Sequence, residues 1–295
     1  MNNLDDVTFC IKTVRRPNAC ARLVRSIQAV VSDAQILVVD DGPYFERFST
    51  VHAELAKPLH VINTETIDLG VGVGRNLLLD SVGTELLFLF DDDHVVTPWL
   101  DLPKLLNTYR LHQEDLDLLG VLQGADSMPF MLTPILEDTR IWMHRGEKFR
   151  RGSVAWCDMS PNAFLARTET LRERHRWDED LKTFEHWEYF YRASRNGLRT
   201  AVDTSCGIRH ERPKNKKYQR KHRSRLQFLH RGLAKHGFDV LDGTHPITPI
   251  MFSSCCASSA RWPSVSTCRA SKSSRGLMSA THSVATLCPF SPFKG

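Results

Sequence analysis

Several features that mark other classes of protein are missing from this chain of 295 residues. No apolar run approaches the roughly 20 residues that a membrane-spanning helix needs. The N-terminus, Met1 to Asp6, lacks the character of a signal peptide. We therefore expect either a cytoplasmic protein or a fragment cut from an anchored precursor.

Paired-cysteine motifs are also missing. The eight cysteines include no C-x-x-C pair, so the sequence does not predict a structural zinc site. Cys10 lies in an apolar, strand-like stretch and is expected to be a buried thiol. A disulfide between Cys157 and Cys206 would need an oxidising compartment, and the sequence leaves this pairing open.

Acidic residues are absent from the end of the chain. From Gly243 to Gly295 there is no Asp or Glu, serine is enriched, and four of the eight cysteines occur. A segment of this composition, without apolar periodicity, cannot build an ordinary core. We expect one domain over residues 1–242 and a disordered tail over 243–295.

Basic residues, in contrast, are concentrated in one stretch. The net charge is only +5, but the stretch from Arg209 to Arg231 contains ten Lys or Arg residues and a single acid, Glu211. Such a run could bind nucleic acid, an acidic membrane or a phosphorylated ligand, or could be a solvated helix. Because aromatic residues are sparse in it, we do not expect a single-stranded nucleic acid partner.

Short apolar segments alternate with helical patterns in the first half of the chain. The segments predict strands at Val7–Thr13, Ile36–Val39, Leu59–Ile62 and Leu86–Phe90. One helix is expected to open at Pro17 with Asn18 as its N-cap, and another to follow the glycine-rich turn within 70–81. This alternation favours an α/β fold with a doubly wound, mainly parallel sheet.

The second half of the chain is more mixed. Residues 98–110 look helical, with Pro103 marking either a break or the true start. Extended segments are expected within 153–166. A helix over Glu185–Asn196 should end at Gly197, and a strand over Leu198–Val202 should follow.

Acidic residues follow two of the predicted strands. The apolar run 86–90 ends in Asp91, Asp92 and Asp93, and the run 36–39 ends in Asp40 and Asp41. Ligands bind at the carboxyl ends of strands in open α/β sheets. A hard divalent cation that bridges carboxylate to phosphate would relieve the repulsion among adjacent acids. A solvated acidic turn is the alternative, but two acidic strand ends at one sheet edge favour a site.

Taken in order, these motifs resemble a known family. They are Phe9–Thr13, Val38–Gly42, the glycine turn 70–76 and the three aspartates. Over roughly Val7 to Phe238 they are similar to the nucleotide-sugar glycosyltransferases of the GT-A fold, family 2. A closer similarity, to the β-1,4-N-acetylgalactosaminyltransferase group that includes ganglioside GM2 synthases, rests on Cys10-Ile11-Lys12-Thr13, Asp68-Leu69-Gly70, Gly74-Arg75-Asn76-Leu77-Leu78, Asp158 through Asn162 to Ala166-Arg167-Thr168, and Glu185-His186.

This resemblance implies a UDP-sugar donor and a divalent metal. The residues expected to bind the donor are Thr13, Arg15, Asp41, Arg75, Asn76, Asp91 and Asp92. Asp91 and Asp93 match the first and last acids of the family's DxD motif, with Asp93 expected to contact the metal directly. His210 matches a later histidine that ligates the metal in many members, although a lone histidine is more often structural. Because imidazole suits Mn²⁺ better than Mg²⁺, Mn²⁺ is the expected ion.

The resemblance also implies a catalytic base. An inverting transfer needs a base near the acceptor hydroxyl, and many members use the last acid of a Glu-Asp pair at a helix start. This chain has Glu185-His186 there, a departure shared by the galactosaminyltransferase-like group. Glu185 is then the expected base and Glu188 the second choice, unless Glu185 only interacts with the helix dipole. Trp156 and Asp158 are expected acceptor contacts, with a core role as the alternative for Trp156.

Together these features imply a metal-dependent, inverting glycosyltransferase that moves a sugar, with GalNAc the best guess, from a UDP-sugar to a glycan or glycolipid hydroxyl. The family often folds the segment after the late histidine over the donor, so Lys214, Lys216 and Lys217 would screen the diphosphate or bind an anionic acceptor. A fragment of an anchored enzyme would work in the Golgi lumen.

Three rival functions remain. A dinucleotide-binding fold would explain Gly70, Gly72 and Gly74 before a helix, with Asp91 about 20 residues on. However, its third glycine should fall where Arg75 sits, and its glycines should follow a strand directly. A sugar-nucleotide-binding pseudoenzyme would keep the carboxylates without transfer. A nucleic-acid binder would show salt-sensitive binding that survives loss of Asp93.

Overall fold

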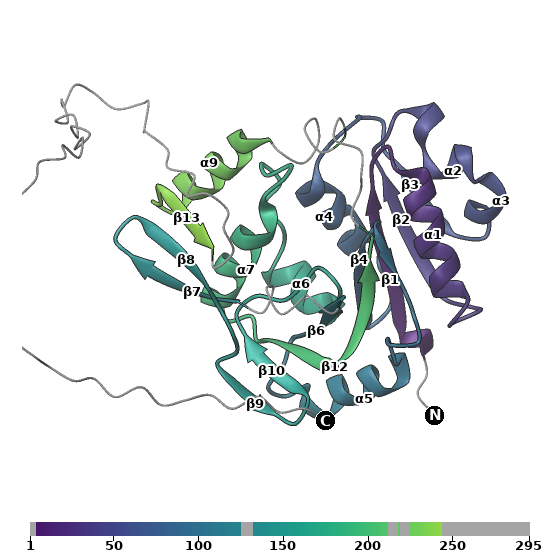
Figure 1. Ribbon diagram of the computed structural model, residues 1–295. Coiled ribbons are helices and arrows are strands. Elements are labelled where there is room, and N and C mark those ends of the chain that lie inside the picture. Colours follow the sequence, from purple (N-terminus) through teal and green to yellow (C-terminus); the bar gives the residue numbers. More distant parts are fainter. Residues whose placement is uncertain (1–3, 125–131, 212–217, 219–224, 244–295) are drawn as a thin grey trace, which may run out of the picture. The chain divides into compact units, whose positions relative to one another are not determined.

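The computed structural model of the chain describes residues 4–124, 132–211, 218 and 225–243 (Figure 1). The predicted tail over 243–295 lies outside the described residues except for Gly243, and so do Lys214, Lys216 and Lys217. No helix in the described part of the chain is long and apolar enough to cross a membrane.

One large sheet runs through the molecule in the order β3-β2-β1-β4-β11-β6-β12-β10-β9, with β5 paired to β12. Strands β3, β2, β1 and β4 are parallel neighbours, and β6 and β12 are also parallel, whereas β11, β10 and β9 pair in antiparallel fashion. The predicted mainly parallel α/β sheet is therefore confirmed. Its strands are β1 (Val7–Thr13), β2 (Gln35–Asp40), β3 (His60–Asn63), β4 (Leu86–Asp91), β5 (His94–Val95), β6 (Leu118–Gln123), β9 (Phe149–Arg151), β10 (Val154–Cys157), β11 (Phe164–Arg167) and β12 (Thr200–His210).

A second, smaller sheet has the order β13-β8-β7 and was not predicted. It consists of β7 (Leu132–Glu137), β8 (Arg140–Arg145) and β13 (Val240–Gly243). Its last strand pairs in parallel with β8, so the end of the described chain returns to residues about 100 positions earlier.

Helices cover both faces of the large sheet, because its central strands are apolar on both sides. On β4, Phe88 and Phe90 pack into the cluster that includes α1 and α5, whereas Leu87 and Leu89 pack into the cluster that includes α4 and α7. The helices are α1 (Pro17–Gln28), α2 (Phe48–Val51), α3 (Ala53–Ala56), α4 (Val71–Ser81), α5 (Leu102–His112), α6 (Thr168–Arg174), α7 (Glu185–Arg195) and α9 (Leu226–Lys235), with short 3-10 turns η1 (Leu4–Asp6) and η2 (Tyr44–Glu46).

The observed starts of α1 and α5 correct one predicted helix cap and settle the role of Pro103. Helix α1 begins at Pro17, so its N-cap is Arg16 and the predicted Asn18 cap is wrong. The Asn18 carboxamide instead contacts His52 Nε2 at 2.8 Å. Helix α5 begins at Leu102, with the Asp101 side chain accepting a hydrogen bond from the Lys104 amide, so Pro103 marks a helix start and not a break.

The last strand of the large sheet is longer than predicted. The sequence indicated a strand only as far as Val202, but β12 continues to His210 through an irregularity between Asp203 and Gly207. The Asp203 carboxylate accepts hydrogen bonds from the Ser205 amide and hydroxyl, which satisfies the polar groups of this bulge. This extension carries His210 toward β5.

The four described cysteines, Cys10, Cys20, Cys157 and Cys206, are free and buried. The predicted buried thiol at Cys10 is confirmed, and the Cys157–Cys206 disulfide is not formed. Burial raises the pKa of the Cys157 thiol to about 12, which keeps it protonated at neutral pH.

Candidate active site

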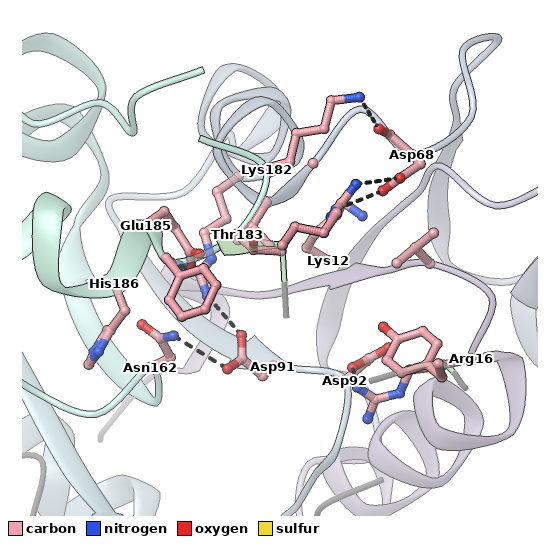
Figure 2. Close-up of a pocket in the computed structure, with 17 residues that line it drawn as sticks. Lys12, Arg16, Asp68, Asp91, Asp92, Asn162, Lys182, Thr183, Glu185 and His186 are labelled. Atoms are coloured by element: carbon pink, nitrogen blue, oxygen red, sulfur yellow. Dashed lines mark hydrogen bonds and ion pairs between the residues drawn. The ribbon is translucent and has the colours of Figure 1, made fainter. Parts of the chain in front are cut away.

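The carboxyl ends of three parallel strands converge on one edge of the sheet. Lys12 on β1 is in register with Asp91 on β4, and Thr13 is in register with Asp40 on β2. A cavity of about 280 Å³ opens at this edge (Figure 2). Its lining includes Lys12, Arg16, Asp68, Gly70, Arg75, Asp91, Asp92, Asn162, Lys182, Thr183, Glu185, His186, Tyr218 and Arg225.

Arg75 links the strand acids to the start of α7. Its side chain comes from α4, is almost fully buried, and places Nη2 2.7 Å from Asp91 Oδ1 and Nη1 3.1 Å from Glu185 Oε1. Asn162, just before β11, donates to the other Asp91 oxygen at 3.4 Å. A buried cation shared by two carboxylates holds all three groups in a fixed arrangement. The structure thus brings together the predicted residues Arg75, Asp91 and Glu185.

Asp41 is also buried at this edge, and each oxygen of its carboxylate contacts a group of the protein. Lys12 Nζ lies 2.6 Å from Asp41 Oδ1, and the Gly70 amide donates to Oδ2 at 3.2 Å. Asp41 therefore fixes Lys12 and the turn before α4, while Lys12 itself lines the cavity.

Asp92 and Asp93 are bridged by Arg16. The guanidinium places Nη1 3.0 Å from Asp92 Oδ1 and Nη2 3.0 Å from Asp93 Oδ2. Thr13 Oγ1 donates to the other Asp92 oxygen at 2.7 Å. Burial would lower the pKa of Arg16, but the two carboxylates raise it above its usual value, so the guanidinium stays charged.

Asp93, His94 and His210 form a group whose nitrogen and oxygen atoms could hold a metal ion. His210 Nε2 lies 3.4 Å from Asp93 Oδ1, the oxygen opposite the one that faces Arg16. Both ring nitrogens of His94 already face protein groups: Nδ1 accepts a hydrogen bond from the Asp91 amide at 3.1 Å, and Nε2 lies 3.0 Å from Gln123 Nε2. One carboxylate oxygen and one imidazole nitrogen, from Asp93 and His210, therefore fit a divalent ion such as Mn²⁺.

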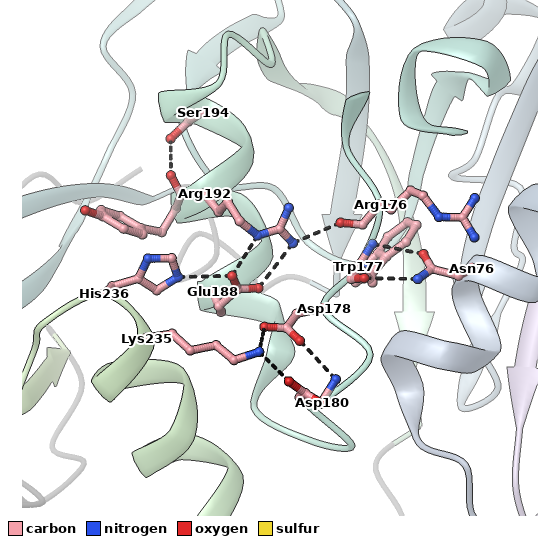
Figure 3. A network of polar contacts seen from close by, with 11 residues as sticks. Asn76, Arg176, Trp177, Asp178, Asp180, Glu188, Arg192, Ser194, Lys235 and His236 are labelled. Carbon is pink, nitrogen blue, oxygen red and sulfur yellow. Dashed lines mark hydrogen bonds and ion pairs between the residues drawn. The ribbon is translucent and has the colours of Figure 1, made fainter. Parts of the chain in front are cut away.

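Glu185 and Glu188 occupy different environments although they are one turn apart. Glu185 is the first residue of α7 and lines the cavity. Glu188 is buried and does not line the cavity. Its Oε1 lies 2.7 Å from Arg192 Nε and 3.1 Å from His236 Nε2 (Figure 3). Burial would raise the pKa of Glu188, but these hydrogen bonds lower it below its usual value, so Glu188 holds α7 against α9 as an anion.

His186 is a poor base in this arrangement. Its Nε2 lies 2.8 Å from the Ser160 carbonyl oxygen, which can only accept, so this nitrogen carries a proton. Burial lowers the pKa of His186, which favours the neutral ring. Glu185 is thus the carboxylate of the Glu-His pair that faces the cavity.

The glycine turn packs against the segment that leads into α7, and does not form an open cradle. A Cβ added at Gly70 would lie 2.6 Å from the Lys182 Cα, and one added at Gly72 would collide with the Asp178 carbonyl oxygen. The Val71 amide also donates to the Lys182 carbonyl. Because the chain itself fills this space, the glycines do not serve as a dinucleotide fingerprint.

Four predicted donor-binding residues do not line the cavity: Thr13 and Asp41, described above, and also Arg15 and Asn76. Arg15 has φ of 54° and turns its side chain to Glu46 at 2.7 Å, leaving the neighbouring Arg16 to line the cavity. The Asn76 carboxamide donates to the Trp177 carbonyl oxygen at 3.0 Å and accepts from the Trp177 amide at 2.9 Å (Figure 3). These two hydrogen bonds anchor the segment before Glu185. Asn76 therefore positions the segment that leads to Glu185 and does not itself line the cavity.

The predicted acceptor contacts lie at the opposite edge of the sheet. Strand β10 is antiparallel to β12, with Cys157 opposite Thr200, the first residue of β12. Trp156 and Asp158 therefore lie near the amino ends of the parallel strands, where they line a separate cavity of about 400 Å³. Trp156 is buried and stacked on Phe149, which favours its alternative core role.

The sequence reasoning missed Lys12, Arg16, Asn162 and Tyr218 as cavity residues. Lys12 and Asn162 lie within the segments that carried the family resemblance, so their positions were available as a signal. Arg16 could not be distinguished from Arg15, because two adjacent arginines after a strand look equivalent until the backbone turn is known.

Comparisons with known proteins identify the family of this chain. The family model described as glycosyl transferase family 2 matches residues 8–171. Beta-1,4 N-acetylgalactosaminyltransferase 1 of Mus musculus is 28% identical over 198 residues, which cover 62% of this chain and 35% of that protein. The same-named protein of Rattus norvegicus is 28% identical over 200 residues, with the same coverage. The chain spans about a third of the length of these curated relatives.

Solved structures support the same fold. The crystal structure of S. aureus TarS 1–349 in complex with UDP-GlcNAc superposes with a TM-score of 0.54 at 18% identity, covering 75% of this chain and 63% of that chain. GalNAc-T7 with UDP, GalNAc and Mn²⁺ gives a TM-score of 0.53 at 14% identity, covering 69% of this chain and 42% of that chain. At these identities the likeness concerns the fold alone, and it is the GT-A fold. Since the family model covers more than half of the chain, this protein belongs to glycosyltransferase family 2.

Proposed function

We propose that this protein transfers a sugar from a UDP-sugar to a hydroxyl group of a glycan or glycolipid, with inversion at the anomeric carbon. The observation that carries the proposal is the position of Glu185, a cavity-lining carboxylate bound through Arg75 to the strand-end acid Asp91. A displacement at a sugar carbon needs a base for the attacking hydroxyl, placed beside the residues that bind the donor.

In this reaction the acceptor hydroxyl oxygen attacks the anomeric carbon while the bond from that carbon to the diphosphate oxygen breaks. The hydroxyl proton passes to Glu185, and the electron pair of the broken bond leaves with UDP. Arg75 Nη1, 3.1 Å from Glu185 Oε1, orients the Glu185 carboxylate before the proton arrives. Lys12 and Arg16 supply positive charge on the side of the cavity where the strands end.

A divalent ion, Mn²⁺ in preference to Mg²⁺, would be held by Asp93 and His210, and would neutralise charge on the departing diphosphate. Asp92 is already engaged by Thr13 and Arg16, and Asp91 by Arg75 and Asn162. Asp93 also pairs with Arg16 through Oδ2, but its Oδ1 lies beside His210, so Asp93 is the acid assigned to metal contact.

GalNAc is the proposed donor sugar. Two relatives at 28% identity are named as N-acetylgalactosaminyltransferases, and one structural neighbour was solved with UDP and GalNAc. Another neighbour was solved with UDP-GlcNAc, so the test must compare both sugars.

The test is UDP release from a panel of UDP-sugars, with and without Mn²⁺. We expect metal-dependent release, highest with UDP-GalNAc. Asp93→Ala should abolish turnover while circular dichroism and the melting temperature show a folded protein. Full activity of that variant would overturn the metal assignment, and release with another sugar would retire only the GalNAc specificity. Metal-dependent UDP binding with no transfer to any acceptor would identify a pseudoenzyme.

A further inference from the structure

Three adjacent acids at a strand end repel one another before any ligand binds, and in the described part of the chain Arg75 and Arg16 are paired with them. Arg75 pairs with Asp91, and Arg16 pairs with both Asp92 and Asp93. The Arg16 side chain is only 9% exposed, and the carboxylates it contacts are 7% and 1% exposed. Because water screens so little here, the Arg16 charge acts strongly on its surroundings.

The two oxygens of Asp93 face different partners. Oδ2 lies 3.0 Å from Arg16, and Oδ1 lies 3.4 Å from His210 Nε2. A metal ion on the Oδ1 side would therefore share one carboxylate with a guanidinium. Two cations on a single carboxylate repel each other, so Arg16 weakens metal binding as long as no further anion is present.

A diphosphate changes this balance, since it is an anion that both cations can face. Arg16 lines the same cavity as Lys12 and Asp91, and the Tyr218 ring lies over its guanidinium at 5.3 Å. With a nucleotide diphosphate in that cavity, Arg16 gains an anionic neighbour and its repulsion of the metal is compensated.

We infer that Arg16 is a positioning residue that makes metal binding conditional on the nucleotide diphosphate, by holding Asp92 and Asp93 as a counter-ion when the diphosphate is absent. This inference rests on the proposed function. It predicts positive coupling between Mn²⁺ and UDP, and by linkage each ligand strengthens the other to the same degree.

The experiment measures Mn²⁺ binding to the full chain by electron paramagnetic resonance of the free ion, with and without saturating UDP. In the wild type we expect UDP to tighten Mn²⁺ binding about tenfold or more. In Arg16→Gln, Mn²⁺ alone should bind more tightly than in the wild type, and the coupling should fall below about threefold. Arg16→Lys retains the charge and should keep the wild-type coupling to within about threefold.

The matched control is Arg25→Gln, which removes the same charge from α1, the helix whose N-cap is Arg16. Arg25 is exposed and lies about two and a half turns from Arg16, roughly 13 Å along the helix, where solvent screens its charge. Its coupling should equal that of the wild type. Arg16→Met carries the same test if the Gln variant does not fold.

Three results would overturn the inference while leaving the proposed function intact: undiminished coupling in Arg16→Gln, weaker binding of Mn²⁺ alone in that variant, or loss of coupling in Arg16→Lys. A wild-type protein that binds neither Mn²⁺ nor UDP would overturn both.

Discussion

Two glutamates on one helix show how environment decides the role of a residue. Glu185 and Glu188 are a single turn apart in α7. Glu188 is bound by Arg192 and His236 and serves the packing of α7 on α9. Glu185 meets Arg75 and lines the cavity, where it is the proposed base.

This contrast predicts different outcomes for two matched substitutions. Glu185→Gln should lower the transfer rate by about 10²–10⁴-fold, because the amide cannot accept the hydroxyl proton. UDP binding should be retained, since the amide oxygen still accepts from Arg75. The rate and the UDP affinity, measured on the same preparation, check this expectation.

Glu188→Gln is the comparison. It should lower the melting temperature through the weakened contacts with Arg192 and His236. A folded Glu188→Gln protein without transfer activity, beside an active Glu185→Gln protein, would move the base assignment one turn along α7.

Single residues divide into those that the sequence could place and those that it could not. Arg75, Asp91 and Glu185 were predicted, and the structure brings them together. Trp156 and Asp158 have suitable chemistry for an acceptor, but the antiparallel direction of β10 places them at the sheet edge opposite the cavity that Asp91 lines. Strand direction depends on tertiary pairing, which local composition does not reveal.

At the scale of elements, the start of α4 and the segment 178–182 fit together closely. The backbone of that segment occupies the space that side chains would need at Gly70 and Gly72. The segment leads directly into Glu185, so this contact fixes where α7 begins.

Gly72→Ala should therefore destabilise the protein by about 1–3 kcal/mol, the usual cost of overpacking. Its Cβ would meet the Asp178 carbonyl oxygen, which can move only with the backbone. Gly83→Ala is the control, because nothing lies within 4 Å of a Cβ at that position. Urea denaturation of both variants tests the difference, and equal stabilities would contradict the packing argument.

Elements with strong local signals were predicted well. The apolar runs of β1, β2 and β4 gave parallel strands, and Gly197, with φ of 89°, ends α7 as expected. The strands β7 and β8 were missed because their stability comes from pairing with each other and with β13. The far half of β12 was missed because its polar bulge resembles a loop.

For the whole molecule, β13 determines how far the chain can be shortened without loss of a described element. Val240–Gly243 pairs in parallel with β8, and Leu241 packs against one of the two large apolar clusters. A chain that stops before this strand exposes the edge of β8 and part of that cluster.

A chain ending at Gly243 should have the same melting temperature as the full chain, if residues 244–295 add no core as their composition predicts. A chain ending at Phe238 should melt at a lower temperature, since it lacks β13. Scanning calorimetry of the full chain and the two shortened chains measures the three melting temperatures. A large loss of stability on ending at Gly243 would contradict the prediction of a tail without a core.

Arg75 links two carboxylates of the site that have different proposed roles. It is the shared partner of Asp91, on the donor side, and of Glu185, the proposed base. While Glu185 is ionised, one guanidinium serves two carboxylates. In the proposed mechanism Glu185 loses its charge when it takes the acceptor proton, and the Arg75 guanidinium then pairs with the Asp91 carboxylate alone. The proposed base and the strand-end acid are thereby coupled through one side chain.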